Sequence, residues 1–443
     1  MKQAKDRWLQ IGKELLWLKA VIESRLDQLN GEADFSFPKA PGKQLLRAVF
    51  GKSEIEAWGV EERFVLILAL CPHIAPEFLD NIFTEKLSKA GDFPQLGGLR
   101  GQQFRGFLPT GETAIFLLAG NDLEKRLQYR KLFSTEHFFS KHQVLWLEDP
   151  PAGEPRLSGK IVLSSDYIDL LVQGEMSRPK FSLQFPAQLL ETEMEWEDLV
   201  LPGTTLRQIE ELEHWLKYHD KLMLDYGMSK RLKPGYRVMF HGPPGTGKTL
   251  TATLLGKRTG KDVYRVDLSM VVSKFIGETE KNLANLFARA ENKDWILFFD
   301  EADALFGKRT NVRDAHDKYA NQEVSYLLQR IESYDGLVIL ASNLKSNIDD
   351  AFLRRFQSII HFPPPKAAER YRLWQQTFPK ELSPDKSVDL TAIARKYEIT
   401  GANIVNIVQY SCLTVLARKE KSIDEATIVE GINREFAKEG KIA

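Results

Sequence analysis

The feature that most limits how this chain can fold is a glycine-rich run with the spacing of a phosphate-binding loop, or P-loop. The run consists of Gly242, Pro243, Pro244, Gly245, Thr246, Gly247, Lys248 and Thr249. An apolar, strand-like stretch precedes it, and a helical stretch follows from Leu250. The run therefore predicts a strand–loop–helix unit that binds a nucleotide through residues 242–250.

Each residue type in this run suits the chemistry of phosphate binding. Glycines let the backbone approach phosphates closely and turn its amides toward them. The N-terminus of the following helix also faces the anion. Lys248 is expected to supply positive charge to the β- and γ-phosphates, and Thr249 to supply a hydroxyl ligand to Mg²⁺.

A second strand-like run ends in two carboxylates. Residues 295–299 are apolar and are followed by Asp300 and Glu301. In a parallel α/β sheet, such groups lie at the carboxyl edge, where ligands bind. We expect Asp300 to hold Mg²⁺ through water and Glu301 to orient and polarise the attacking water. Alone, the run could be a strand that ends in a solvated acidic loop, but together with the P-loop it predicts ATP hydrolysis.

From about residue 196 the chain alternates short apolar runs with helical stretches, which predicts an α/β domain with parallel strands. The strand-like runs are at 237–241, 263–266, 295–299, 337–341 and 359–362. After three prolines at 363–365 the pattern is helical to the end. We expect a large α/β subdomain over 196–362 and a small helical lid over 363–443.

The N-terminal part has a mainly helical pattern. Helical runs occur at 8–29, 43–50, 54–71 and 77–88, and they predict a helical domain over 1–150 that is compatible with a winged helix. The run 8–29 is expected to pack on its own domain, with a short coiled coil as the alternative. Prolines and glycines between 151 and 195 predict a loosely structured connector.

Composition limits the partners. Lys and Arg number 61, as do Asp and Glu, so no global field attracts nucleic acid or an anionic membrane. Cys71 and Cys412 are far apart and are expected to be reduced thiols. The apolar runs are too short or too charged to span a bilayer. We expect a cytoplasmic protein with neither nucleic acid nor membrane as a partner.

With these motifs, residues 196–443 resemble the ATPase module of the AAA family, within the AAA+ superfamily. The resemblance implies ATP and Mg²⁺ as cofactors. It implies that residues 196–201 lie along the adenine and that Asn343, at a strand end, holds the water or the γ-phosphate. Gly401 and Ala402 would contact the adenine from the lid. The next residue, Asn403, departs from the arginine of the wider superfamily, so no arginine is assigned there.

Residues 351–356 resemble the arginine-finger segment of the family. There, arginines reach the nucleotide of the neighbouring subunit and stabilise charge on the transferring phosphoryl group. The commoner pattern separates two arginines by Pro-Gly, whereas Arg354 and Arg355 are adjacent here, which leaves open which one acts. Fingers supplied by a neighbour imply a ring, and the resemblance implies a homo-hexamer.

Two further resemblances concern what the ATPase acts on. Residues 274–280 are similar to the first pore loop of the family, in which Phe275 and Ile276 would grip an extended polypeptide substrate. The alternative is that both are ordinary core residues. Residues 306–321 and 108–112 resemble the bacterial AAA ATPases encoded with contractile injection systems, whose components would then be partners.

The leading hypothesis is therefore a hexameric AAA ATPase that remodels or unfolds proteins as a chaperone-like unfoldase. One alternative is a nucleic-acid motor or loader, which DNA-stimulated hydrolysis would support; the sequence lacks a basic stripe interleaved with aromatics. The other is a scaffold whose assembly is gated by ATP binding. A fused zinc protease is not expected, because no His-Glu-x-x-His motif occurs.

Overall fold

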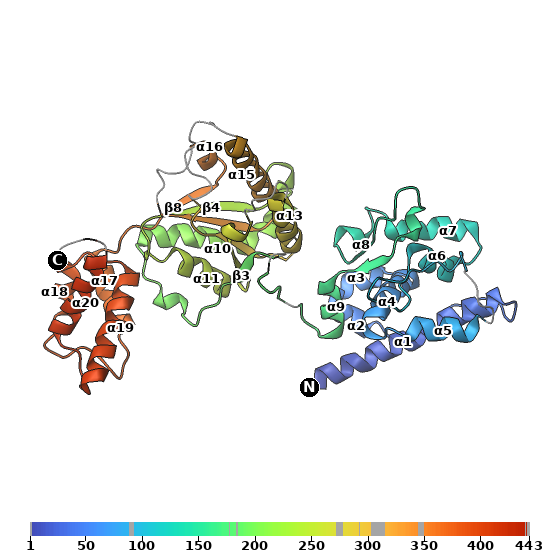
Figure 1. Ribbon diagram of the computed structural model, residues 1–443, viewed down its shortest axis with the longest axis horizontal. Helices are drawn as coiled ribbons and strands as arrows, with labels where there is room; N and C mark the ends of the chain where they lie inside the picture. The colour runs from blue at the N-terminus through green and yellow to red at the C-terminus, as the bar shows by residue number, and fades with distance from the viewer. Residues whose placement is uncertain are drawn as a thin grey trace. The chain divides into compact units, whose positions relative to one another are not determined.

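A computed structural model (Figure 1) describes residues 2–87, 93–176, 178–182, 185–271, 278–291, 293–302, 315–343, 350–438 and 440. The chain divides into two compact units, Met1–Arg178 and Pro179–Ala443. Each unit has its own hydrophobic core.

The C-terminal unit is built on a six-stranded sheet with the strand order β3-β5-β6-β7-β4-β8. Its strands are β3 (Ala187–Leu189), β4 (Tyr236–His241), β5 (Val263–Val266), β6 (Ile296–Phe299), β7 (Leu337–Ser342) and β8 (Ser358–His361). The strands β4 to β8 pair in parallel, and β3 pairs antiparallel with β5 at the edge. The parallel α/β fold and the positions of its predicted strands are confirmed.

Helices cover both faces of this sheet (Figure 1). On one face, α10 (Gly203–Leu224) and α11 (Lys248–Thr259) share a core with Val238 and Phe240. On the other, α13 (Glu278–Ala290) and α15 (Ala315–Ser333) share a core with Met239. Because strands buried on both faces need apolar side chains at every position, their sequences read as continuous apolar runs. The short helices here are η3 (Trp196–Asp198), η4 (Met228–Lys230), α12 (Leu268–Val271) and α16 (Asp350–Leu353).

The end of the chain forms a helical lid around its own core. Its helices are α17 (Ala367–Thr377), α18 (Leu390–Lys396), α19 (Gly401–Arg418) and α20 (Glu425–Lys438). Trp374 on α17 is fully buried there together with Ile404, Ile407 and Ile432. The lid is thus a separately packed body inside the C-terminal unit.

The N-terminal unit is mainly helical, as predicted. Its elements are α1 (Lys2–Leu29), α2 (Gln44–Phe50), α3 (Lys52–Ala57), α4 (Val60–Ile74), α5 (Phe78–Lys86), α6 (Gly111–Ala119), α7 (Leu123–Tyr129), η1 (Arg130–Phe133), α8 (Phe138–Lys141), β1 (Leu145–Leu147), η2 (Arg156–Ser158), β2 (Ile161–Leu163) and α9 (Ser165–Val172). Helix α1 buries Leu18, Val21, Ile22 and Leu26 in this core, so it packs on its own domain. The expected likeness of this unit to a winged helix stays a prediction.

Residues 151–195, expected to be a loose connector, belong instead to the two units. Strand β2 pairs with β1, and Leu171 of α9 is fully buried in the N-terminal core. Strand β3 joins the sheet of the C-terminal unit. The prolines and glycines that suggested a linker separate these short elements, each of which packs against a partner distant in sequence.

Among the described residues, no single helix is both long and apolar enough to cross a bilayer, whereas the bent pair α4 and α5 could do so by length and composition alone.

Candidate nucleotide-binding site

The P-loop connects the end of β4 to the start of α11, which begins at Lys248. Gly245 and Gly247 have φ angles of +76° and +96°, a conformation that side chains with a Cβ disfavour. A Cβ on Gly245 would also lie 2.7 Å from both Thr400 Oγ1 and the Cβ of Ala402. Glycine at this position therefore permits both the turn and the close approach of the lid.

Lys248 lies at the centre of the site and is 7% exposed. Its Nζ donates hydrogen bonds to the carbonyl oxygens of Gly242 at 2.7 Å and Pro243 at 3.1 Å. It also donates to Asn343 Oδ1 at 3.2 Å. The lysine therefore joins the P-loop to the end of β7, two segments that the sequence predicted to meet.

The two carboxylates lie at the same edge of the sheet. Asp300 and Glu301 follow β6, which pairs with β7, which in turn pairs with β4. The Glu301 amide donates to Asp300 Oδ1 at 3.0 Å, and Glu301 itself has a φ angle of +50°. Parallel pairing thus brings Asp300, Glu301, Asn343 and the P-loop around one cavity.

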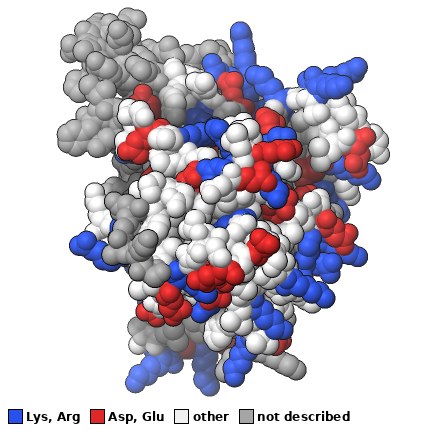
Figure 2. All heavy atoms as spheres, turned by 90° about the vertical axis from the view of Figure 1, so that its right-hand side faces the viewer, with Lys and Arg blue, Asp and Glu red and all other residues white. Residues whose placement is uncertain are grey.

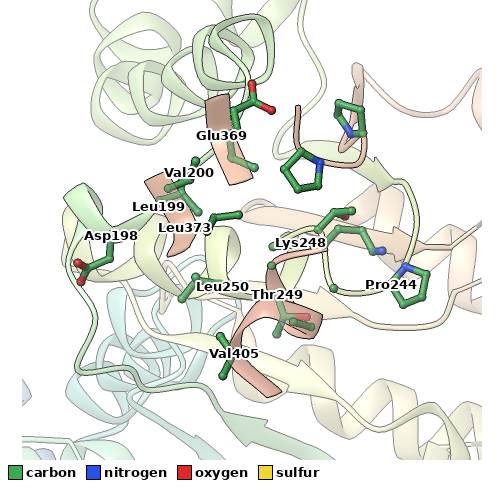
Figure 3. A pocket seen from close by; sticks show the side chains of 18 of the residues that line it. Asp198, Leu199, Val200, Pro244, Lys248, Thr249, Leu250, Glu369, Leu373 and Val405 are labelled. Carbon is green, nitrogen blue, oxygen red and sulfur yellow. The ribbon is translucent and has the colours of Figure 1, made fainter. Parts of the chain in front are cut away.

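This cavity has a volume of about 570 Å³ and is closed by the lid on one side. Its polar end is lined by Pro244, Gly245, Thr246, Gly247, Lys248, Thr249, Asp300, Glu301 and Asn343. The rest is mostly apolar: Leu199, Val200 and Leu373 lie together there, while Lys248 points toward Pro244 (Figure 3). A polar end beside an apolar slot suits a nucleotide, which has a triphosphate at one end and a flat base at the other.

The donor set also fits Mg²⁺. Thr249 and Asp300 both line the polar end, and a hydroxyl with a carboxylate provides the hard oxygen ligands that Mg²⁺ prefers. Such sites need few protein ligands because the ion keeps several waters. Among the described residues there is no cluster of three or more His, Cys, Asp or Glu side chains that could hold a metal by itself.

The lid reaches the cavity through the start of α19. Gly401 and Ala402, the predicted lid contacts to the adenine, line it, and the Ala402 amide donates to the Gly245 carbonyl at 3.3 Å. Asn403 accepts a hydrogen bond from the Thr400 amide at 3.0 Å and donates to Glu435 Oε2 at 3.1 Å. Where the wider superfamily has an arginine, this chain therefore has a residue that caps α19 and binds α20.

The lid also contributes residues that sequence reasoning missed. Leu373, Gln376 and Thr377 on α17 and Val405 on α19 line the cavity. On a helical pattern, these positions look like any others, and only the folded lid shows that they face a ligand site.

Arg354 and Arg355 follow α16 and do not line the cavity of their own chain. Arg355 forms an ion pair with Glu332 on α15. Arg354 is exposed and has no ion-pair partner within the described ranges. The two adjacent arginines are thus in different situations, one held within the chain and one directed to solvent.

Two motifs that bear on the substrate lie partly outside the described residues. In the motif 274–280, the undescribed residues are 274–277, which include Phe275 and Ile276. In the motif 306–321, they are 306–314. The run 108–112 is described and lies at the start of α6. There Thr110 Oγ1 accepts from the Thr113 amide at 3.3 Å, so this run serves as a helix cap in the N-terminal unit.

Comparison with known sequences agrees with this geometry. Residues 238–364 match the family described as "ATPase family associated with various cellular activities (AAA)". This match covers the sheet from β4 to β8, together with the P-loop, Asp300, Glu301 and Asn343.

Several curated proteins are similar to part of the chain. The proteasome-activating nucleotidase of Aeropyrum pernix is 34% identical over 212 residues, which are 46% of this chain and 51% of that protein. The ATP-dependent zinc metalloprotease FtsH 2 of Symbiobacterium thermophilum is 32% identical over 52% of this chain and 40% of its own length. The cell division cycle protein 48 homolog of Archaeoglobus fulgidus is 30% identical over 56% of this chain and 33% of its own length.

This chain thus spans about half, or less, of the length of the relatives that it matches. The family match, over residues 238–364, lies in the part that carries the candidate nucleotide site. The fold, the motifs and the family match agree that residues 238–364 form an AAA ATPase domain.

Proposed function

We propose that the cavity between the P-loop and the lid binds ATP with Mg²⁺ and hydrolyses it. The observation that carries this proposal is the Lys248 ammonium, which contacts both the P-loop carbonyls and Asn343 at the edge where Asp300 and Glu301 lie. Few functions besides phosphoryl transfer need a lysine, an amide and two carboxylates around a glycine-rich loop.

The proposed roles follow from position. Lys248 and the P-loop amides hold the β- and γ-phosphates, and the Thr249 hydroxyl and Asp300 carboxylate hold the Mg²⁺. The exposed Glu301 carboxylate orients water in line with the γ-phosphate and accepts its proton. Asn343, already bonded to Lys248, fixes that water or a γ-phosphate oxygen. When bound, Mg²⁺ offsets the charge that develops on the phosphates.

Among the described residues, no arginine lines the cavity of one chain to contact the transferring phosphoryl group. We propose that Arg354 of a neighbouring copy supplies it. Arg355 is engaged with Glu332 inside its own chain, which favours Arg354 as the group that reaches outward. If each copy supplies this arginine to the next one in a head-to-tail arrangement, the copies can close into a ring. We propose that the ring has six copies.

The Lys248→Ala variant tests the assignment of the site. Loss of the ammonium removes the main charge that faces the phosphates, so ATP affinity should fall at least tenfold and Mg²⁺-dependent phosphate release should be abolished. Binding is measured with a fluorescent ATP analogue and turnover by phosphate release. If the variant binds and hydrolyses ATP like the wild type, the nucleotide lies elsewhere.

For the work that hydrolysis drives, we propose remodelling of a polypeptide substrate. One relative is named a proteasome-activating nucleotidase and another an ATP-dependent zinc metalloprotease, and these names support the proposal. Phe275 and Ile276 are the proposed gripping residues. Service to a contractile injection system rests on the resemblance of residues 306–321 and 108–112 alone. A nucleotide-gated scaffold remains the alternative if hydrolysis proves dispensable.

A nucleic-acid motor has less support. The face turned toward the right of Figure 1 shows Lys and Arg interspersed with Asp and Glu (Figure 2). Such a mixed surface provides no continuous basic track for a phosphate backbone on the face that is drawn. The zero net charge points the same way.

A further inference from the structure

The lid is hydrogen-bonded to the rest of the C-terminal unit on both sides of the nucleotide cavity. On the phosphate side, the Ala402 amide donates to the Gly245 carbonyl. On the apolar side, Gln376 Nε2 on α17 donates to the Glu197 carbonyl at 3.1 Å. The first contact involves the P-loop, whereas the second involves a segment that no phosphate would touch.

The segment that receives the Gln376 bond leads directly into the apolar wall. Glu197 lies in η3, and two residues later the chain forms the wall with Leu199, Val200 and Leu201. Leu199 and Leu201 are each 6% exposed and packed into the core beneath the sheet, so this wall is fixed.

The same segment is anchored to the large subdomain from its other side. Lys257 on α11 donates to Glu195 Oε1 at 2.7 Å and to the Met194 carbonyl at 3.0 Å. The Arg258 guanidinium lies 4.6 Å from the centroid of the Trp196 ring. The Glu197 carbonyl is therefore held in place, and Gln376 brings the lid to it.

The opposite wall of the slot is on the same helix as Gln376. Leu373, one turn before Gln376, and Thr377, one residue after Gln376, both line the cavity. A change in the distance between α17 and Glu197 would therefore move Leu373 relative to Leu199 and Val200. The bond from Gln376 thus joins the two segments that carry the apolar walls of the slot.

From this arrangement we propose that Gln376 is a positioning residue for the nucleobase. It donates to the Glu197 carbonyl and so holds α17 at the distance at which Leu373 and the wall 199–201 enclose a flat aromatic ring. It acts on the binding of the base and not on the phosphates, which lie at the other end of the cavity. The inference rests on the proposed function of this cavity as the nucleotide site.

The chain provides a matched control. Gln375 is the neighbouring residue of α17 and is also exposed, but its Nε2 donates to Tyr371 Oη within the helix at 2.9 Å. Gln375→Met and Gln376→Met remove the same amide group and keep a similar side-chain length. Only the second removes the bond to Glu197. Thermal unfolding of both variants checks that the lid is intact.

The test measures KM for ATP, kcat at saturating ATP, and the Kd of a fluorescent ADP on the full chain. Loss of one hydrogen bond of this kind should raise the KM and Kd of Gln376→Met about threefold to tenfold, with kcat within a factor of about two. Gln375→Met should match the wild type. Equal constants for the two variants, or a fall in kcat at unchanged KM, would overturn the proposal.

The Lys248→Ala variant keeps this test separate from that of the site itself. If Lys248→Ala loses nucleotide while Gln376→Met matches its control, the site stands and the role of Gln376 fails. If Lys248→Ala binds fluorescent ADP as well as the wild type, the site assignment fails first.

Discussion

At the scale of single residues, Glu301 combines an exposed carboxylate with a backbone that L-residues rarely adopt. Its φ angle of +50° is in the left-handed region, which costs a non-glycine residue about 1–3 kcal/mol. Two hydrogen bonds hold Glu301 in this conformation. Its own amide donates to Asp300 Oδ1, and the amide of the next residue, Ala302, donates to the Ala341 carbonyl. Such strain is common where a side chain must be aimed at a ligand.

The Glu301→Gln variant tests the proposed role of this carboxylate in activating the attacking water. Glutamine has the same shape but accepts a proton poorly, so phosphate release should fall by a factor of about 10²–10⁴ while ATP affinity stays within a few-fold of the wild type. Both are measured on one preparation, by phosphate release and by binding of a fluorescent ATP analogue. Turnover near the wild-type rate would show that another group activates the water.

The residues at the phosphate end could be predicted from sequence because their chemistry is local. Lys248 and Thr249 lie inside one loop, and Asp300 and Asn343 follow strands that parallel pairing aligns. The base end could not be predicted in the same way. Gln376 becomes a cavity residue only when α17 folds back over η3, a contact 179 residues apart in sequence.

At the scale of elements, the parallel strands could be predicted because strands buried on both faces are uniformly apolar. Strand β3 was missed because it is three residues long and directly follows Pro186. Its partner β5 lies far along the chain, and pairing at such separation leaves no local periodicity. The same reason explains why β2 and α9 looked like parts of a connector.

The joint between α19 and α20 depends on the ionised state of Glu435. Burial opposes its ionisation, but hydrogen bonds from Lys438, Asn403 and Asn406 prevail and lower its pKa. A carboxyl group whose pKa is lowered by folding adds stability above its ordinary pKa, and that stability is lost as the pH falls through the folded value. At neutral pH the ionised Glu435 therefore stabilises the contact between α19 and α20 in the lid.

The Glu435→Ala variant should lower the unfolding free energy by about 1–2 kcal/mol at pH 7, because the half-buried Asn403 and the exposed Asn406 lose the charged acceptor that their amides share. The difference from the wild type should be constant above about pH 5 and shrink below about pH 4. Glu430→Ala, an exposed neighbour on α20, serves as the control. A difference that persists unchanged at low pH would mean that the charge of Glu435 plays no part.

At the scale of the whole molecule, the account requires more than one copy of the chain. In the described part of the chain, the residues that line the cavity include Lys248, Glu301 and Asn343 but no arginine. Arg354 lies at the surface after α16, and its neighbour Arg355 is paired with Glu332. We propose an active site shared between copies, in which the exposed Arg354 of one copy serves the cavity of the next.

Mixing two inactive variants tests this central claim most directly. Lys248→Ala should be inactive because it cannot hold ATP, and Arg354→Ala because it cannot complete the site of its neighbour. In a mixed ring, an Arg354→Ala copy keeps an intact cavity, and an adjacent Lys248→Ala copy can supply the arginine to it. The account predicts that the mixture regains measurable phosphate release that neither variant shows alone. Full activity of Arg354→Ala by itself, or no recovery in mixed rings of confirmed assembly, would contradict it.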